Sequence, residues 1–411
     1  MTGVTRDLGG GLVLRPATTA DHEGIVGLNI AAHGATERGA VEHLLSQRWV
    51  VVVDATERVV SCSVLLDHEG RYGSVPIRIG QIEYVASAPE FRRRGLVRAQ
   101  FAHHHEVSET LGQHLTVVTG IPYFYRRLGY GYGLDWPERL RVVDRHLEAD
   151  PGWKVERAVE ADLDALMALA ERAHRAADLV AFRPRDDWAW LVGEAIGHDE
   201  EVLVARRDRP DGGHPPAEGF ARLQRHGDAK YARCELFDAA ADSISAARAL
   251  LTHARRGELG ADLAVLDRPG TAWSAAVRAA AEPTQRYHPV YARIADPVAF
   301  LRHVRPVLSD RLTASAFARE VGTLVLSTYV ASIQVSYERG RVTDVEPGPG
   351  IEDPFEEGLP GVSPDAVPAL LLGRFGASGL DARVDDAMLG PALPLLDVLF
   401  PPMRVDLPTT V

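Results

Sequence analysis

The sequence predicts two successive mixed α/β domains and, after them, a domain of the α+β class. Three observations predict this architecture. The chain has 411 residues, which is more than one ordinary domain of roughly 100–200 residues contains. One pattern near the N-terminus recurs in the middle of the chain, as in a duplicated fold. The last part indicates a helix, a run of antiparallel strands and further helices, which is typical of α+β domains.

The repeat joins "LRPATTADHEGIVGLNIAAH", which begins at Leu14, with "VERAVEADLDALMALAERAH", which begins at Val155. An offset of 141 residues, from 21 to 162, places Asp162 on Asp21. Each copy indicates a short strand, an Asp or Thr that starts a helix, and apolar residues at helical spacing. Because the offset is also a reasonable domain length, we predict domains at residues 1–150, 151–294 and 295–411.

In the first copy, strand patterns and a helical pattern alternate as a mixed sheet requires. Two β-rich runs lie within residues 48–73 and are separated by a turn at Asp54 to Glu57. Further elements follow in order: a strand at 75–88, a helix at 93–111, a strand at 114–120, a short helix at 123–128 and a strand at 139–143.

The second copy has matching pieces, and the third domain has a different order. Strands are predicted at 201–208 and 217–226, a strand and a helix within 229–257, and a strand within 261–270. The third domain opens with a helix at 296–312, continues with antiparallel strands within 322–347, and ends with helical segments within 363–376 and 387–400.

Composition narrows the classes of function. Acidic residues outnumber basic ones, 57 against 45, and the formal net charge is -12. This balance argues against nucleic acid as a partner and suits a cationic substrate such as an amine. Cys62 and Cys234 lie in apolar strand patterns, so we expect buried thiols and no metal. No signal-peptide core and no run of about 18 apolar residues is present, so we expect a cytoplasmic protein without a membrane span.

The segment "VASAPEFRRRGLVRA" carries the most specific signal in the sequence. Three arginines, Arg92 to Arg94, follow a predicted strand and open a predicted helix. Most charge runs are solvated helix faces. Here, however, free N–H groups and the helix dipole make an anion site, Gly95 allows a phosphate to approach the main chain, and the guanidinium groups donate to phosphate oxygens. We therefore predict a pyrophosphate cradle.

This segment resembles the acetyl-coenzyme A loop of the GNAT acetyltransferase superfamily, here Arg92-x-x-Gly95-x-Val97, with Val97 in place of a small residue. The resemblance implies acetyl-CoA as co-substrate. It also implies a strand that runs beside the pantetheine arm and offers amides to the developing oxyanion. The implied cofactor-binding residues are Val85, Ala86, Ser87, Arg92, Arg93, Arg94, Gly95, Leu96 and Val97.

A second motif, "GIPYFYRRLGYGYG" at residues 120–133, resembles the GNAT segment in which an aromatic–Tyr pair opens a short helix beside the thioester. The resemblance implies that Tyr125 is the general acid, which protonates the leaving thiolate. The alternative is that Tyr125 only packs within a cluster of aromatic residues.

The layout of nearly the whole chain is similar to the enhanced intracellular survival (Eis) family. This similarity implies two tandem GNAT-type mixed-sheet domains, the second degenerate, and an α+β sterol carrier protein-like domain. The second copy lacks an arginine–glycine loop, so one cofactor site is expected. The family also implies a homohexamer and acceptors such as aminoglycosides, polyamines or lysine side chains.

Two carboxylates compete for the role of base. In the family the C-terminal carboxylate enters the active site, which here is that of Val411, although the tail "MRVDLPTTV" lacks an aromatic ending. The rival is Glu83, which lies two residues before Val85 and therefore on the same face of the strand. Alternatively, Glu83 is a structural carboxylate paired with an arginine.

Other clusters carry weaker signals. The run "HHHE" at residues 103–106 does not have the spacing of a zinc motif on a helix, and we expect it on a solvated helix face. His33 and Glu37 follow the first helix and are expected beside the acceptor cleft. A non-catalytic alternative also stands: a scaffold protein that uses its C-terminal domain to bind a lipid or a protein partner.

Overall fold

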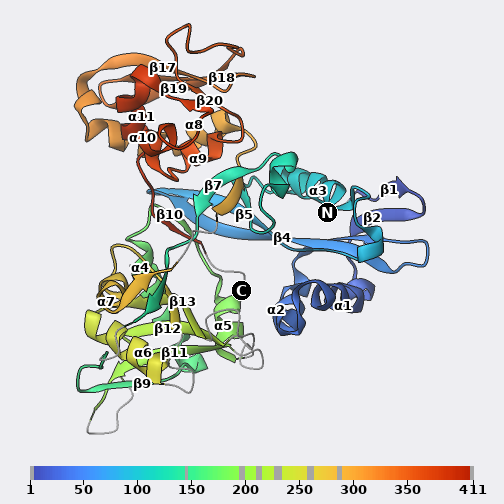
Figure 1. Ribbon diagram of the computed structural model, residues 1–411, viewed down its shortest axis with the longest axis vertical. Coiled ribbons are helices and arrows are strands. Elements are labelled where there is room, and N and C mark those ends of the chain that lie inside the picture. Colours follow the sequence, from blue (N-terminus) through green and yellow to red (C-terminus); the bar gives the residue numbers. More distant parts are fainter. Residues whose placement is uncertain are drawn as a thin grey trace.

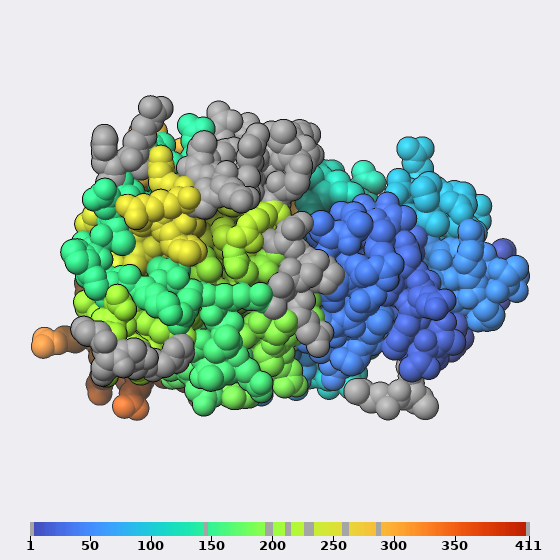
Figure 2. Space-filling model, turned by 90° about the horizontal axis from the view of Figure 1, so that it is seen from below, coloured from blue at the N-terminus to red at the C-terminus, as the bar shows by residue number. Residues whose placement is uncertain are grey.

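The computed structural model describes residues 4–143, 147–193, 200–209, 215–225, 234–256, 263–284 and 289–407. These residues form three lobes, each built around a sheet (Figure 1). The predicted mixed α/β class is confirmed. Seen from below, the first lobe, in blue, lies directly against the green and yellow second lobe (Figure 2). One apolar cluster joins the two, because Ile25 and Val26 of the first lobe pack with Leu166 and Trp188 of the second.

The first sheet carries helices on both faces. Its main path of strands runs in the order β1 (Arg6–Gly9), β2 (Leu12–Pro16), β3 (Arg48–Val53), β4 (Val59–Tyr72), β5 (Val75–Ser87), β6 (Leu115–Val118), β16 (Pro289–Arg293) and β7 (Gly131–Asp135). The helices of this lobe are α1 (His22–His33), α2 (Arg38–His43) and α3 (Leu96–Thr110).

The second sheet has the order β15 (Ala281–Pro283), β8 (Arg139–Val142), β14 (Leu263–Leu266), β13 (Cys234–Ala241), β12 (Gly219–Arg225), β11 (Glu200–Arg207) and β9 (Trp153–Arg157). Its helices are α4 (Leu163–His174), α5 (Arg185–Gly193), α6 (Ile244–Arg256) and α7 (Ala272–Ala280).

The internal repeat is present in the structure with the offset read from the sequence. Strands β2 and β9 begin at residues 12 and 153, and helices α1 and α4 begin at residues 22 and 163. The aligned aspartates also have the same structural role. Asp21 accepts the Thr18 N–H at 2.7 Å, and Asp162 accepts the Val159 N–H at 3.0 Å. Each aspartate thus satisfies a backbone donor at the start of its helical segment.

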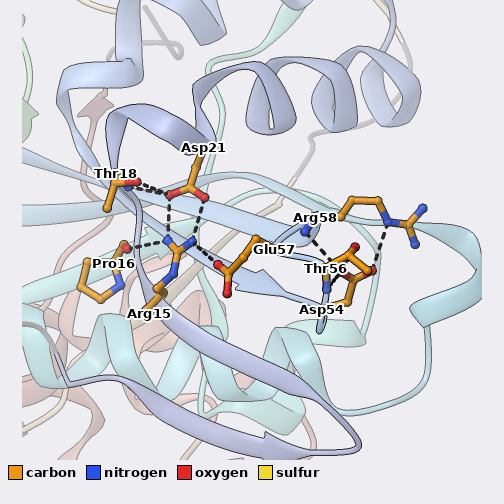
Figure 3. A network of polar contacts seen from close by, with 8 residues as sticks. All are labelled: Arg15, Pro16, Thr18, Asp21, Asp54, Thr56, Glu57 and Arg58. Atoms are coloured by element: carbon orange, nitrogen blue, oxygen red, sulfur yellow. Dashed lines mark hydrogen bonds and ion pairs between the residues drawn. The ribbon is translucent and has the colours of Figure 1, made fainter.

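A guanidinium group fixes each of these aspartates. Arg15 donates two hydrogen bonds to Asp21, at 2.7 and 3.0 Å (Figure 3). In the second copy an arginine from a different strand, Arg206, lies 2.6 Å from Asp162. Figure 3 also shows the predicted turn between β3 and β4, where Asp54 accepts the Thr56 N–H at 2.9 Å.

Two strands pair in a different sheet from the one expected from the predicted domain boundaries. β8 lies within residues 1–150 but pairs in the second sheet, and β16 lies within residues 151–294 but pairs in the first. Each inserts between corresponding neighbours, β16 between β6 and β7, and β8 between β14 and β15. The two sheets therefore exchange equivalent strands. A local apolar pattern does not specify the sheet in which a strand pairs.

The third lobe has the predicted helix-then-strands order. A five-stranded sheet runs β19 (Arg341–Gly348), β18 (Ser332–Glu338), β17 (Val321–Ser327), β20 (Gly361–Val362) and β21 (Ala387–Met388). Its helices are α8 (Pro297–Thr313), α9 (Val367–Leu371), α10 (Gly376–Asp381) and α11 (Leu393–Leu399).

The chain then returns to the first sheet. There β22 (Val405–Asp406) pairs in parallel with β10 (Leu179–Ala181), which pairs with the far end of β4. Segments from all three lobes thus meet at one sheet. In the described residues, no helix is long and apolar enough to cross a membrane.

Candidate active site

The central strand of the first sheet has one open edge. β5 pairs in parallel with β6 only from Ile79, opposite Leu115, to Ile82, opposite Val118. Beyond Ile82 the two strands separate, and in the stretch that follows, Glu83, Ala86 and Ser87 pair with β4 alone. Main-chain groups of an unpaired strand edge are available to a ligand. The candidate residues Val85, Ala86 and Ser87 all lie on this open stretch.

A β-bulge lies at the start of the open stretch. The register between β4 and β5 shifts between the pairs Val64–Glu83 and Cys62–Ala86. Tyr84, within the bulge, has a φ of 52°, a left-handed conformation that is rare for residues other than glycine. Bulges increase the local twist and re-aim side chains. This one directs Tyr84 toward the helical segment after α1.

The Tyr84 side chain is held by residues that the sequence placed beside the acceptor cleft. Its hydroxyl donates to a carboxylate oxygen of Glu37 at 2.9 Å, and its ring lies 5.9 Å from that of His33 and 6.2 Å from that of Trp49. Burial, followed by the charge of Glu37, raises the pKa of Tyr84. Nothing in the local sequence signalled the bulge, so Tyr84 and Trp49 were missed.

The predicted cradle lies between β5 and α3. A short 3-10 turn (Pro89–Phe91) leads into Arg93, with a φ of 64°, and Gly95, with a φ of 80°, and α3 begins at Leu96. A Cβ atom on Gly95 would have no heavy atom within 4 Å, so the space in front of the main chain is open. In the described chain, the N–H groups of residues 93–98 have no hydrogen-bond acceptor. Consecutive free amides at a helix start bind anions.

The three arginines surround this loop with exposed positive charge. Arg92, Arg93 and Arg94 are all exposed, and among the described residues none of them forms an ion pair with a carboxylate. Arg92 Nε donates to the Ser87 carbonyl at 3.3 Å, and the Arg94 guanidinium lies 4.9 Å from the centroid of the Phe91 ring. Their charges are therefore available to a phosphate.

A buried hydrogen-bond chain connects α3 to the open strand. Ser63 Oγ lies 2.9 Å from His104 Nε2 and donates to Gln100 Oε1 at 2.7 Å. Gln100 Nε2 donates to Ser61 Oγ at 2.6 Å, and Ser61 donates to the Ala86 carbonyl at 2.8 Å. These four side chains are almost completely buried. The chain fixes β5 against α3 where the pantetheine arm is expected.

Part of the HHHE run differs from its prediction. His103 and His104 are buried rather than on a solvated helix face. Burial lowers the pKa of His104 to about 3, so this side chain is neutral and serves the hydrogen-bond chain. The reason is the helical phase, since His104 follows Gln100 by four residues on the face of α3 that packs on the sheet. In the described residues no group of His, Cys, Asp or Glu is arranged to hold a metal ion.

Tyr125 lies in a short 3-10 helix (Phe124–Leu128) and is 5% exposed. Its ring lies 5.5 Å from that of Phe101 and 5.3 Å from that of Tyr291. Gly120 has a φ of 137°, and a Cβ atom there would lie 3.1 Å from the Tyr125 hydroxyl, so the backbone conformation favours glycine. Burial, followed by the charge of Glu83, raises the pKa of Tyr125 to about 12. The phenol is therefore protonated at neutral pH and able to donate.

Of the two candidate bases, the structure describes only Glu83. Glu83 lies on the bulged strand, accepts a hydrogen bond from Gln81 at 2.8 Å, and acts on the pKa of Tyr125. Val411 lies outside the described residues. The last described residue is Leu407, directly after β22.

The second sheet has a similar bulge, but its described residues form no cradle after it. Between β12 and β13 the register shifts, and Asp238 has a φ of 51°, close to that of Tyr84. Only Asp242 and Ser243 separate β13 from α6. The Ser243 hydroxyl accepts the Ala246 N–H at 3.1 Å, so a side chain occupies the place of an anion. Within the described residues, the start of α6 therefore differs from the start of α3, where the backbone amides have no such partner.

Comparisons with known proteins agree with this geometry. Residues 13–133 match the family model described as an acetyltransferase (GNAT) domain, which includes the bulge, the cradle and Tyr125. The sequence has no significant match among proteins with curated descriptions. The N-terminal part of the chain is therefore a GNAT acetyltransferase domain, and the protein is an acetyl-CoA-dependent acyltransferase.

Solved structures share the fold over almost the full length. A GCN5-related N-acetyltransferase from Kribbella flavida is 20% identical, with a TM-score of 0.64 over 96% of this chain and 97% of that one. Another, from Anabaena variabilis, is 13% identical, with a TM-score of 0.68 over 96% and 99%. Eis1 from Mycobacterium abscessus is 18% identical, with a TM-score of 0.64 over 95% and 97%. At these identities the likeness concerns the fold.

Proposed function

We propose that this protein transfers the acetyl group of acetyl-CoA to a primary amine of a small cationic molecule, of the aminoglycoside or polyamine type, or of a lysine side chain. One observation carries the proposal. The open edge of β5 has the free amides of residues 93–98 at one end and the buried phenol of Tyr125 near the other. A thioester with a long diphosphate-bearing arm is a ligand that needs both features.

The cofactor would lie along the open strand. Its diphosphate accepts hydrogen bonds from the amides of Arg93 to Val97, and the guanidinium groups of Arg92 to Arg94 compensate its charge. Its pantetheine arm runs beside Val85, Ala86 and Ser87 and pairs with their main chain, as an added strand would. The thioester then reaches the bulge.

The reaction is a direct attack in a ternary complex. The amine nitrogen forms a bond to the thioester carbonyl carbon, and amides at the bulge stabilise the tetrahedral oxyanion. The C–S bond then breaks as Tyr125 gives its proton to the leaving sulfur, and the acylated nitrogen gives up its extra proton, which restores the phenol. The raised pKa of Tyr125, to about 12, keeps that proton available over the physiological range.

Before the attack, a carboxylate removes one proton from the substrate ammonium, directly or through water, so that the nitrogen has a free electron pair. Glu83 is one candidate, because it lies on the bulged strand. The carboxylate of Val411 is the other. β22 is parallel to β10, and β10 is antiparallel to β4. β22 therefore runs along β4 toward its lower residue numbers, which is the direction of the bulge.

Acidic side chains favour a cationic acceptor. Glu37 accepts the Tyr84 hydroxyl at 2.9 Å, and Glu83 directly precedes Tyr84 in the strand, so two carboxylates lie at the bulge. Such a negative site attracts and orients an ammonium group.

The remaining expectations extend this proposal. The second lobe is a degenerate GNAT domain, supported by the shared offset and the Asp238 bulge. The third lobe is a sterol carrier protein-like domain, in line with its helix-and-sheet order. A cytoplasmic homohexamer without a nucleic-acid partner stays a prediction from the sequence.

An assay of free thiol release tests the proposal. The parent protein, given acetyl-CoA and a panel of polyamines and aminoglycosides, should release coenzyme A with at least one of these amines. Tyr125→Phe should bind acetyl-CoA as the parent does, measured by calorimetry, and lose about 100-fold or more in kcat. An equally active Tyr125→Phe would refute the acid, and a parent that binds no acetyl-CoA would favour the scaffold alternative.

A further inference from the structure

Tyr291 reaches the candidate acid from a strand that belongs to the other repeat. It lies in β16, which follows the second sheet in the chain but pairs in the first, with Tyr291 opposite Val118 of β6 and Tyr132 of β7. The side chain is 1% exposed. Its ring lies 5.3 Å from the ring of Tyr125, at an angle of 66°.

The hydroxyl of Tyr291 holds the segment that carries Tyr125. It lies 2.8 Å from the hydroxyl of Tyr132 and 3.3 Å from the carbonyl oxygen of Ile121, and its proton serves both acceptors. The Tyr132 hydroxyl also accepts the N–H of Tyr123 at 3.0 Å. Two phenols from neighbouring strands therefore bind the main chain at two points just before Tyr125.

This segment has few other supports. Ile121, Tyr123 and Phe124 are 64%, 59% and 38% exposed, so their side chains contribute little packing. Tyr123 has a φ of 69°, a conformation that a residue other than glycine keeps only where neighbouring contacts enforce it. The hydrogen bonds that the main chain forms with Tyr132 and Tyr291 hold this conformation.

We propose that Tyr291 is a positioning residue for catalysis. It holds residues 120–124 in the conformation that directs the Tyr125 phenol at the thioester sulfur, and it excludes water from the far side of that phenol. The proposal rests on the role of Tyr125 in the proposed function. It also gives the second repeat, which has no cradle of its own, a contribution to the reaction through the exchanged strand.

The test is steady-state kinetics of Tyr291→Phe, which keeps the ring and removes the hydroxyl. The kcat should fall on the order of tenfold, because a small misplacement of the acid is costly, while the KM for acetyl-CoA stays within about twofold. The high-pH limb of the kcat profile should move to lower pH, because water that reaches Tyr125 reduces the burial that raises its pKa.

Tyr72→Phe is the matched control. Tyr72 is equally buried in the same sheet, and its hydroxyl also donates to a main-chain carbonyl, that of Leu371, at 2.8 Å. It lies away from the Tyr125 segment, at the far end of β4. A general loss of packing would affect both variants, whereas loss of positioning would affect Tyr291→Phe alone. Thermal unfolding of both variants verifies that each is folded.

A double-mutant cycle separates this inference from the acid assignment. If Tyr291 acts through Tyr125, adding Tyr291→Phe to Tyr125→Phe should cause little further loss of kcat. A full additional loss would overturn the inference and leave the acid in place. So would a Tyr291→Phe variant with the kcat and pH profile of Tyr72→Phe. A fully active Tyr125→Phe would overturn the acid assignment itself, and the inference with it.

Discussion

At the scale of single residues, the site depends on buried polar groups with fixed directions of donation. Ser63 donates to Gln100, and Gln100 donates to Ser61. His104 must therefore donate from Nε2 to Ser63, because the Ser63 proton is already used. Burial favours this neutral state of His104 by lowering its pKa to about 3. A histidine that the sequence suggested for a solvated face thus supports strand β5.

The pKa of His104 predicts a dependence of stability on acid. The folded pKa, about 3, lies below the ordinary value of 6.5, so the unfolded chain binds the proton more readily. The contribution to stability is therefore complete above pH 6.5 and is lost as the pH falls toward 3. His104→Gln should reduce the slope of the unfolding free energy against pH in this window, measured by urea titrations. An unchanged slope would show that other groups account for the acid sensitivity.

The residue scale also shows what a sequence pattern can and cannot predict. Arg92, Gly95 and Tyr125 could be proposed as site residues because the motifs that contain them consist of near neighbours in the sequence. Tyr84 was missed, because a bulge is set by the register of two strands and not by a local pattern. His104 was misjudged because a run of histidines resembles a polar surface, while its partner Ser63 lies 41 positions away.

At the scale of elements, the two ends of α3 provide a matched experiment. Gly95 precedes the helix with a φ of 80°, and Gly112 follows it with a φ of 65°. A Cβ atom at either position would have no heavy atom within 4 Å. Replacement by alanine should therefore cost roughly 1–2 kcal/mol of backbone strain at each position, without a steric clash.

The two variants should differ in cofactor binding. The Cβ atom of Gly95→Ala would stand where the diphosphate approaches the amides, so its dissociation constant for acetyl-CoA should rise about tenfold or more. Gly112→Ala should lose similar stability and bind acetyl-CoA as the parent does. Calorimetric titration gives both constants. Equal affinities of the two variants would place the cofactor elsewhere.

The order of the elements was largely predictable, whereas two of their pairings were not. The strands around Val51 and Ile82, helix α3 and the offset between α1 and α4 all follow from apolar periodicity and helix-start signals. The exchange of β8 and β16 does not, because each is a strand of only four or five residues whose local pattern does not specify its partners. Strand pairing depends on residues far apart in the chain, so the local pattern of one sequence does not predict it.

At the scale of the whole molecule, the catalytic domain is completed by the rest of the chain. β16 supplies Tyr291, and the third lobe also supports the segment near Tyr125. Asp365 pairs with Arg126 at 3.2 Å, and Arg374 pairs with Asp135 of β7 at 2.8 Å. A glycine is needed at position 131, because a Cβ atom there would lie 1.6 Å from the Asp365 carbonyl oxygen.

Strand exchange predicts that the first two lobes unfold together. Each sheet contains a strand from the part of the chain that forms the other sheet. Unfolding of one sheet therefore removes a strand from the other and exposes unpaired strand edges. Calorimetry should give one transition for both lobes, at the temperature at which acetyl-CoA binding is lost. Two well-separated transitions, with binding retained after the first, would contradict this coupling.

The central claim is that a thioester lies along the open edge of β5, between the amides at the start of α3 and the phenol of Tyr125. A crystal structure with coenzyme A bound tests it most directly. The account predicts diphosphate oxygens within about 3 Å of the amides of residues 93–98, with the sulfur facing the Tyr125 hydroxyl. A diphosphate bound elsewhere, or a sulfur remote from Tyr125, would contradict it.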